Sequence, residues 1–143
     1  MYQPQQFGVE YAIEEIVVAQ LKALGFEDSS WANNACPSFS RERPLDSDPN
    51  GTLCVNVWVD ARIKGDREHP AEPRFTVDLR EEGGGDECVS IITTDDFWNV
   101  LKMSRETLLM HKFHIIDPDV AFPVRKADLA AAHRILLDRK SVV

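Results

Sequence analysis

The sequence predicts an α+β domain, in which a three- to four-stranded antiparallel β-meander carries an N-terminal helix and two C-terminal helices. Composition is the first reason: a chain of 143 residues, 43% hydrophobic and 28% charged, is typical of one globular domain, here residues 1–143. The second reason is an apolar spacing of three and four residues near the N-terminus. The third is a strict alternation over 52–64. These are the periods of a helix and of a half-buried strand.

The first predicted helix covers residues 8–24. Its apolar residues form one stripe, and its charged residues lie off that stripe. Leu24-Gly25-Phe26 predicts the end of the helix, because glycine takes the left-handed conformation there and Phe26 folds back on the last turn. The stripe consists of Val9, Ile13, Ile16, Val17, Leu21 and Leu24, and the charged residues off it are Glu10, Glu14, Glu15 and Lys22.

A polar segment with three prolines follows, and it predicts a long loop over 27–51. Trp31 and Phe39 are expected to anchor this loop to the core, with a short extended piece near 36–40 as an alternative. The last residues of this segment match the first half of a calcium-binding loop. Val57, however, occupies the position at which such a calcium site needs a carboxylate. We therefore expect an ordinary turn into the next strand.

The clearest strand is predicted over 52–64, and shorter strands are predicted over 74–80 and 88–93. The connections between them are too short for helical crossovers, so the strands should form an antiparallel meander. The inward-facing residues are Leu53, Val55, Val57, Val59, Ala61 and Ile63, followed by Phe75, Val77 and Leu79. The outward-facing residues are Cys54, Asn56, Trp58, Asp60, Arg62 and Lys64, followed by Arg74, Thr76, Asp78 and Arg80.

Two helices are predicted after the meander. Thr93 or Thr94 is expected to cap the first of them, with two aspartates in its first turn. This helix should end near Lys112. The second is predicted over 126–138, after an irregular link that contains two prolines.

The net charge of −8 is unevenly distributed. Residues 1–98 hold 8 basic and 19 acidic side chains, hence −11, whereas residues 99–143 hold 8 basic and 5 acidic ones, hence +3. An acidic run without a single base extends from Glu81 to Asp96. Because phosphate contacts need clustered lysine and arginine, this distribution disfavours direct nucleic-acid binding. It suits a basic protein partner, with a purely solubilising role as the alternative.

No pattern in the sequence predicts a metal or a cofactor. The glycines at 83–85 join two strands beside acidic residues, which is typical of a hairpin tip rather than a phosphate-binding loop. His111 and His114 have the spacing of neighbours on a helix, but no second cluster of metal ligands accompanies them. The motifs of serine hydrolases, zinc proteases and dinucleotide-binding enzymes are absent. We therefore expect no enzymatic activity.

The cysteines Cys36, Cys54 and Cys88 are widely spaced and odd in number. This pattern predicts free thiols and a reducing compartment, the cytoplasm. No apolar run reaches the ~18 residues of a membrane span, and the N-terminal residues lack the charge and the apolar stretch of a signal peptide. We expect no association with a membrane.

Together these observations predict a small acidic, non-catalytic module that binds a protein partner. An aromatic residue with arginines on one sheet face is typical of a binding surface; a helix or loop over that face would instead make Trp58 part of the core. A sharper hypothesis is a phage-type inhibitor, anti-CRISPR-like or otherwise anti-defence, that occupies a basic nucleic-acid-binding surface of its target. The expected partner-binding residues are Glu81, Glu82, Asp86, Glu87, Asp95, Asp96, Trp58, Arg62 and Arg74.

Two alternative functions are left open. One is a structural virion or assembly component, such as a tail-completion subunit, which would form rings in solution. The other is a thiol enzyme that uses Cys36, because this cysteine lies in the predicted loop and functional residues concentrate in loops.

Overall fold

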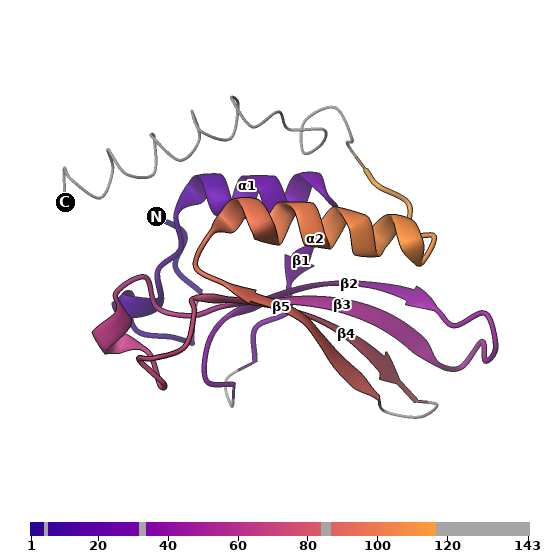
Figure 1. Ribbon diagram of the computed structural model, residues 1–143, viewed down its shortest axis with the longest axis horizontal. Coiled ribbons are helices and arrows are strands. Elements are labelled where there is room, and N and C mark those ends of the chain that lie inside the picture. The colour runs from indigo at the N-terminus through magenta and orange to yellow at the C-terminus, as the bar shows by residue number, and fades with distance from the viewer. Residues whose placement is uncertain (5, 32–33, 84–86, 117–143) are drawn as a thin grey trace.

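The fold is an antiparallel sheet with two α-helices packed on one of its faces (Figure 1). The computed structural model describes residues 1–116 except 5, 32–33 and 84–86. Within these residues the chain forms five strands and two α-helices, which confirms the α+β class. The helix predicted over 126–138 lies outside the described residues, as does Asp86. In the described part of the chain, no helix is both long and apolar enough to cross a membrane.

The order of strands in the sheet follows the chain, β1-β2-β3-β4-β5, and each strand pairs antiparallel with the next. The strands are β1 (Glu27–Asp28), β2 (Ser38–Pro44), β3 (Thr52–Val59), β4 (Phe75–Glu82) and β5 (Cys88–Thr94). The meander of β3, β4 and β5 is confirmed. Two additional strands, β1 and β2, extend it into a wider sheet than the three or four strands expected.

Those two strands come from the segment 27–51, so the prediction of a long loop there is wrong. β2 pairs with β3 along its whole length. Phe39 is fully buried. Arg41 lies on the same face of β2, and a charged residue at this inward position interrupts the apolar alternation that would have predicted a strand. Nη1 of Arg41 donates to the carbonyl oxygen of Leu24 at 2.6 Å, which places a cation at the end of the preceding helix. Trp31, an expected anchor, is 65% exposed.

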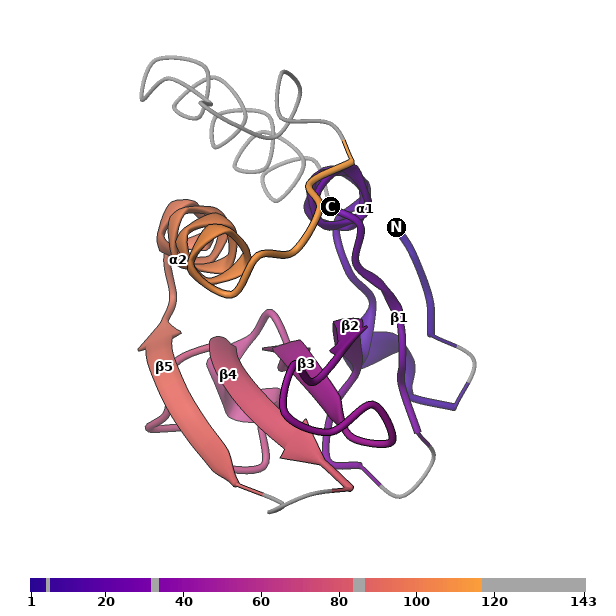
Figure 2. The ribbon, with the colours of Figure 1, turned by 90° about the vertical axis from the view of Figure 1, so that its right-hand side faces the viewer.

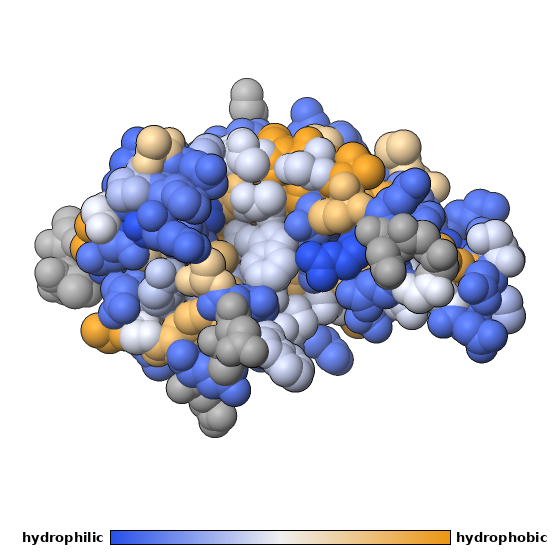
Figure 3. Space-filling view, turned by 90° about the horizontal axis from the view of Figure 1, so that it is seen from below, coloured by the Kyte–Doolittle hydropathy of each residue, from blue (hydrophilic) through white to orange (hydrophobic). Residues whose placement is uncertain are grey.

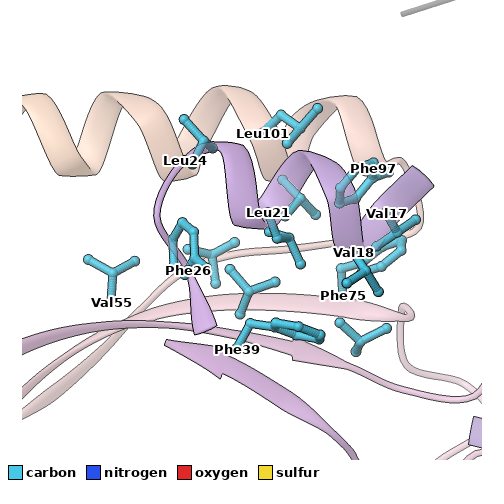
Figure 4. Close-up of a cluster of buried hydrophobic side chains, with 14 of the residues drawn as sticks. Val17, Val18, Leu21, Leu24, Phe26, Phe39, Val55, Phe75, Phe97 and Leu101 are labelled. Atoms are coloured by element: carbon cyan, nitrogen blue, oxygen red, sulfur yellow. The ribbon is translucent and has the colours of Figure 1, made fainter. Parts of the chain in front are cut away.

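The hydrophobic core fills the space between the helices and the sheet (Figure 4). Side chains of α1 (Glu15–Ala23) and α2 (Phe97–Met110) meet the predicted inward positions of β3 and β4. Figure 2 shows α1 on the side of β1 and β2, and α2 above β4 and β5. The fully or nearly fully buried members from these elements include Val17, Leu21, Leu101, Val55, Val57, Val59, Phe75 and Val77.

The strand predicted over 52–64 ends earlier, at Val59. Ala61 is still buried, but Ile63 is 59% exposed, because the chain turns away from the sheet. Arg67 holds this turn: its Nε donates to the carbonyl oxygen of Ala61 at 2.7 Å. The apolar alternation therefore continues for several residues beyond the sheet.

α1 is shorter than the helix predicted over 8–24. It begins at Glu15, after a 3₁₀ turn and an extended stretch, and Val9 of the expected apolar stripe is 79% exposed. Ile13 forms a two-bond backbone bridge with Tyr2, with both N–H to O=C distances at 2.7 Å. This bridge requires an extended backbone, which excludes a helix at that point.

Both helices end in the same hydrogen-bond motif. The predicted end of α1 is confirmed: Gly25 has a φ of 92°, and the amide of Phe26 donates to the carbonyl of Leu21 at 3.0 Å. At the end of α2, Lys112 has a φ of 61°, and the amide of Phe113 donates back to the last turn at 2.8 Å. The same left-handed turn is thus made once by glycine and once by lysine.

The start of α2 differs from the prediction. Asp96, rather than Thr93 or Thr94, is the N-cap, and its Oδ1 accepts from the amide of Trp98 at 3.0 Å. Thr94 supports this cap, because its Oγ1 accepts from the amide of Asp96 at 3.0 Å.

Candidate binding site

The sheet face opposite the helices is polar, and Figure 3 views it directly. Both described helices pack on the other face (Figure 1), so neither of them covers Trp58, which is half-buried. The open face is formed by the alternate outward residues of β2, β3 and β4. Four of them, Ser40, Trp58, Thr76 and Arg80, are half-buried, whereas Ser38, Asn56 and Asp78 are buried.

Trp58 and Asp78 are joined across β3 and β4. Nε1 of Trp58 donates to Oδ2 of Asp78 at 2.8 Å. Asp78 is only 7% exposed, and its other oxygen, Oδ1, is enclosed without a hydrogen-bond donor among the described residues. Arg80, on the same face, lies toward Glu82, with 3.7 Å between Nη1 and Oε1. Burial lowers the pKa of Arg80, but a hydrogen bond with Cys88 and then the negative charge of Asp78 raise it above its ordinary value, so Arg80 already interacts with Asp78 at longer range. Enclosed acceptors without a donor are uncommon in native proteins, so Asp78 is a buried group whose hydrogen bonding is incomplete within the described residues.

A cleft of about 450 Å³ lies at one end of the open face. Trp58, Thr76 and Asp78 contribute from the sheet, and the connections that contain 34–36 and 68–74 contribute the remaining walls. This volume lies within the range of about 300–1,000 Å³ that ligand sites span. The cleft is therefore large enough to take a side chain of a partner.

Acidic groups outnumber basic ones around the cleft. Arg74 also lines it, but its Nη1 and Nη2 both donate to the carboxylate of Glu14 at 2.7 Å. A concave surface with one sign of charge concentrates ions of the opposite sign, so the cleft favours cations. The acidic lining residues are Asp60, Glu68, Glu72 and Asp78.

Cys36 lines the same cleft, together with His69 and Asp60, which are residue types found in thiol enzymes. Burial, and then the negative charges of Asp60 and Glu68, raise the pKa of the Cys36 thiol to about 12. The thiol is thus protonated at neutral pH, whereas nucleophilic cysteines have lowered pKa values. The surroundings of Cys36 suit packing better than catalysis.

The acidic run predicted as one binding segment is divided by the fold. Glu81, Glu82 and Glu87 lie at the β4–β5 hairpin, where the amide of Glu81 donates to the carbonyl of Glu87 at 2.8 Å. Asp95 and Asp96 follow the other end of β5, a strand of seven residues, which corresponds to about 20 Å. The run therefore forms two separate acidic groups.

Several predicted partner-binding residues are engaged within the protein. Asp96 caps α2, and Oδ1 of Asp95 accepts from the amide of Arg74 at 2.9 Å and from Nη1 of Arg67 at 3.2 Å. Arg74, expected on the outward face, is 5% exposed. Arg62 lies in the connection after β3 rather than in a strand. Of the predicted residues, Trp58 and Arg74 line the cleft, and Arg74 is already bound to Glu14.

The cleft also contains residues that sequence reasoning did not connect. Glu68, His69 and Glu72 belong to the connection between β3 and β4, which has the composition of an ordinary polar loop. The acidic residues of this connection are the one feature of its sequence that points to a binding site. The pairing of Trp58 with Asp78 depends on the register between two strands. The sequence of either strand alone does not determine that register.

No family model matches this chain. Comparisons with curated proteins and with solved structures give no match either. Within the described residues, no three His, Cys, Asp or Glu side chains are grouped in a way that would hold a metal ion.

Proposed function

We propose that this protein is a small acidic, non-catalytic module that docks its open sheet face on a basic surface of a protein partner. The observation that carries the proposal is the cleft at the end of that face, where the Trp58 side chain lies beside the buried carboxylate of Asp78. Aromatic residues in such positions contribute strongly to protein interfaces.

The charge of the cleft supports a basic partner. Four carboxylates line it, and the one arginine among its lining residues is neutralised by Glu14. Charge complementarity at an interface guides the partners to each other and disfavours wrong ones. A partner surface rich in lysine or arginine is the natural complement.

The acidic hairpin contributes at longer range. Glu82 and Glu87 are exposed at the tip of β4 and β5, where their charges face solvent. Exposed charges of this kind act mainly on the association rate. This role replaces that of the continuous acidic run, because Asp95 and Asp96 make structural contacts.

Proteins that bind nucleic acid present clustered lysine and arginine, and we propose a partner of this kind. Occupying its basic surface would inhibit it, as phage anti-defence proteins of the anti-CRISPR kind do. A cytoplasmic location agrees with such a partner. The protonated thiol of Cys36 favours binding over thiol catalysis.

Photo-crosslinking in the native host tests the docking face. A benzoylphenylalanine is placed at Thr76, on the open face, and in the matched control at Lys102, which is exposed on α2. We expect the variant at Thr76 to crosslink a basic protein at several-fold higher yield than the control. Equal yields, crosslinks to nucleic acid, or crosslinks between copies of this chain in a ring would contradict the proposal.

The salt dependence of association tests the hairpin. Raising the salt from 0.1 M to 1 M shortens the Debye length from about 10 Å to about 3 Å, so association with the crosslinked partner should slow. Glu82→Gln with Glu87→Gln should lower the association rate and its salt dependence. The control pair, Glu10→Gln with Glu106→Gln, removes the same charge elsewhere and should leave both unchanged.

A further inference from the structure

The cleft on the open face has the chemistry of a site for one cationic side chain. We propose that it receives the guanidinium or ammonium group of an arginine or lysine of the partner, with Asp78 as the counter-ion and the Trp58 ring as a neighbouring wall. This inference rests on the proposed function, and it assigns the recognition to one pocket rather than to overall charge.

One oxygen of Asp78 has no hydrogen-bond donor among the described residues. This carboxylate is 7% exposed, Oδ2 is occupied by Nε1 of Trp58 at 2.8 Å, and Oδ1 has no donor among the described residues. Leaving a buried charged group without its hydrogen bonds is costly. Oδ1 is itself enclosed, so a ligand with N–H donors in the cleft that Asp78 lines would remove that cost once the side chain turns this oxygen toward it.

The remaining charged residues around the cleft are mostly acidic. Asp60, Glu68 and Glu72 line the cleft, and His69 lies among them. Arg74 is held on Glu14 by two bonds of 2.7 Å, so it does not compete for Asp78 through its terminal nitrogens. The cleft thus offers an incoming cation several carboxylates and one aromatic ring.

The lining of the cleft suits an organic cation better than a metal ion. A hard metal ion needs several oxygen ligands at short distance, and the described residues contain no such group of three. A guanidinium or ammonium group on an alkyl stem instead packs against an aromatic face and donates to carboxylates at the same time. The combination of Trp58 and Asp78 suits this second kind of cation.

A titration of the full-length protein with N-acetyl-arginine methylamide tests the pocket directly. The reporter is the NMR signal of the Trp58 indole N–H, assigned by its loss in Trp58→Phe. We expect a saturable shift of this signal, and a much weaker response to the citrulline analogue, which keeps N–H donors but lacks the positive charge. An unsaturable response, or an equal response to citrulline, would overturn the inference.

Charge-matched variants locate the binding. Asp78→Asn keeps an acceptor for Trp58 but removes the charge, and it should weaken the probe roughly tenfold or more, as the loss of one charged hydrogen bond does. Glu68→Gln is an exposed alternative that leaves the buried pair intact, and it should weaken the probe by a smaller factor. Glu82→Gln removes the same charge at the hairpin and should have no effect. Equal affinities in all three variants would overturn the inference.

The two proposals fail separately. The probe titration needs no partner, so it tests the pocket even where crosslinking finds no basic protein. If Thr76 crosslinks a basic partner whose affinity is the same for Asp78→Asn and Glu82→Gln, the module function stands and the pocket assignment is wrong.

Discussion

Glu14 and Arg74 form a buried two-bond ion pair that ties the N-terminal segment to the start of β4. The two residues are 60 positions apart, and both distances between Nη and Oε atoms are 2.7 Å. Their exposed fractions are 3% and 5%. Nε of Arg74 also donates to the carbonyl of Asp60 at 3.0 Å, so the guanidinium is held from two sides.

Glu14→Gln should therefore destabilise the protein by about 3–5 kcal/mol, since it leaves a buried guanidinium without its counter-charge. Urea unfolding measures the loss. Arg43→Gln is the control: it breaks the ion pair with the exposed Asp46 at 2.6 Å and should cost less than about 1 kcal/mol. Similar losses for the two variants would contradict the importance of burial.

This pair also marks where sequence reasoning stops. Local signals were sufficient for Gly25, because a glycine after an apolar stripe needs no distant partner, and for the alternation of β3, because one face of a sheet imposes it. Glu14 and Arg74 both occupied positions that a pattern assigns to the surface. Their burial depends on a contact between two residues that are distant in the sequence. The hydrophobic periodicity of a segment gives no information about such a contact.

The candidate site shows the same division. Trp58 was predicted on the outward face of its strand, and it lies on the open face. The structural role of Asp95 depends on its contact with Arg67, which belongs to the connection between β3 and β4. The cleft depends on the path of two connections across the end of the sheet, which the sequence does not predict. The polar sequence of β2 concealed a strand because arginines occupy part of its inner face.

Asn56→Asp should destabilise the protein by at least about 2 kcal/mol, because Asn56 is 6% exposed and pairs with Asp78 in the register of β3 and β4. Like charges directly opposite each other repel, the more so when buried. Adding Asp78→Asn should recover much of the loss. Thermal unfolding of the two single variants and the double variant measures this coupling, and strictly additive effects would show that the two side chains do not interact.

Lys112→Gly should stabilise the protein by about 1 kcal/mol relative to Lys112→Ala. Lys112 has a φ of 61°, a conformation that glycine adopts without the steric cost other residues incur. The alanine variant loses the same positive charge at the end of α2, so the difference between the two isolates the backbone. Equal unfolding free energies would show that the turn rearranges in the variants.

The three cysteines should differ in reactivity. All are free, with Cys36 and Cys54 buried and Cys88 exposed. We expect a thiol reagent at pH 8 to modify Cys88 rapidly in the folded protein and all three cysteines after unfolding without a reductant. A count below three in the unfolded protein would reveal a disulfide.

Stability should fall in alkaline solution. Burial is the main cause that raises the pKa of Cys36 to about 12 and that of Cys54 to about 11, from an ordinary value of 9. A raised pKa means that the folded state favours the protonated thiol. The contribution of these thiols to the free energy of unfolding is therefore complete below pH 9 and is lost as the pH rises toward 12. Urea unfolding between pH 8 and pH 10 measures the slope. Cys36→Ser should flatten it; an unchanged slope would assign the effect to other groups.

The order of the strands also has a consequence during synthesis of the chain. Each strand neighbours the one made just before it, so the sheet can grow hairpin by hairpin as the polypeptide leaves the ribosome, each step closing a short loop. α1 is made first, yet the helix that packs beside it, α2, and the arginine that neutralises Glu14 are made only after β3. The apolar side of α1 is therefore exposed to chaperones for longer than any strand of the sheet waits for its neighbour.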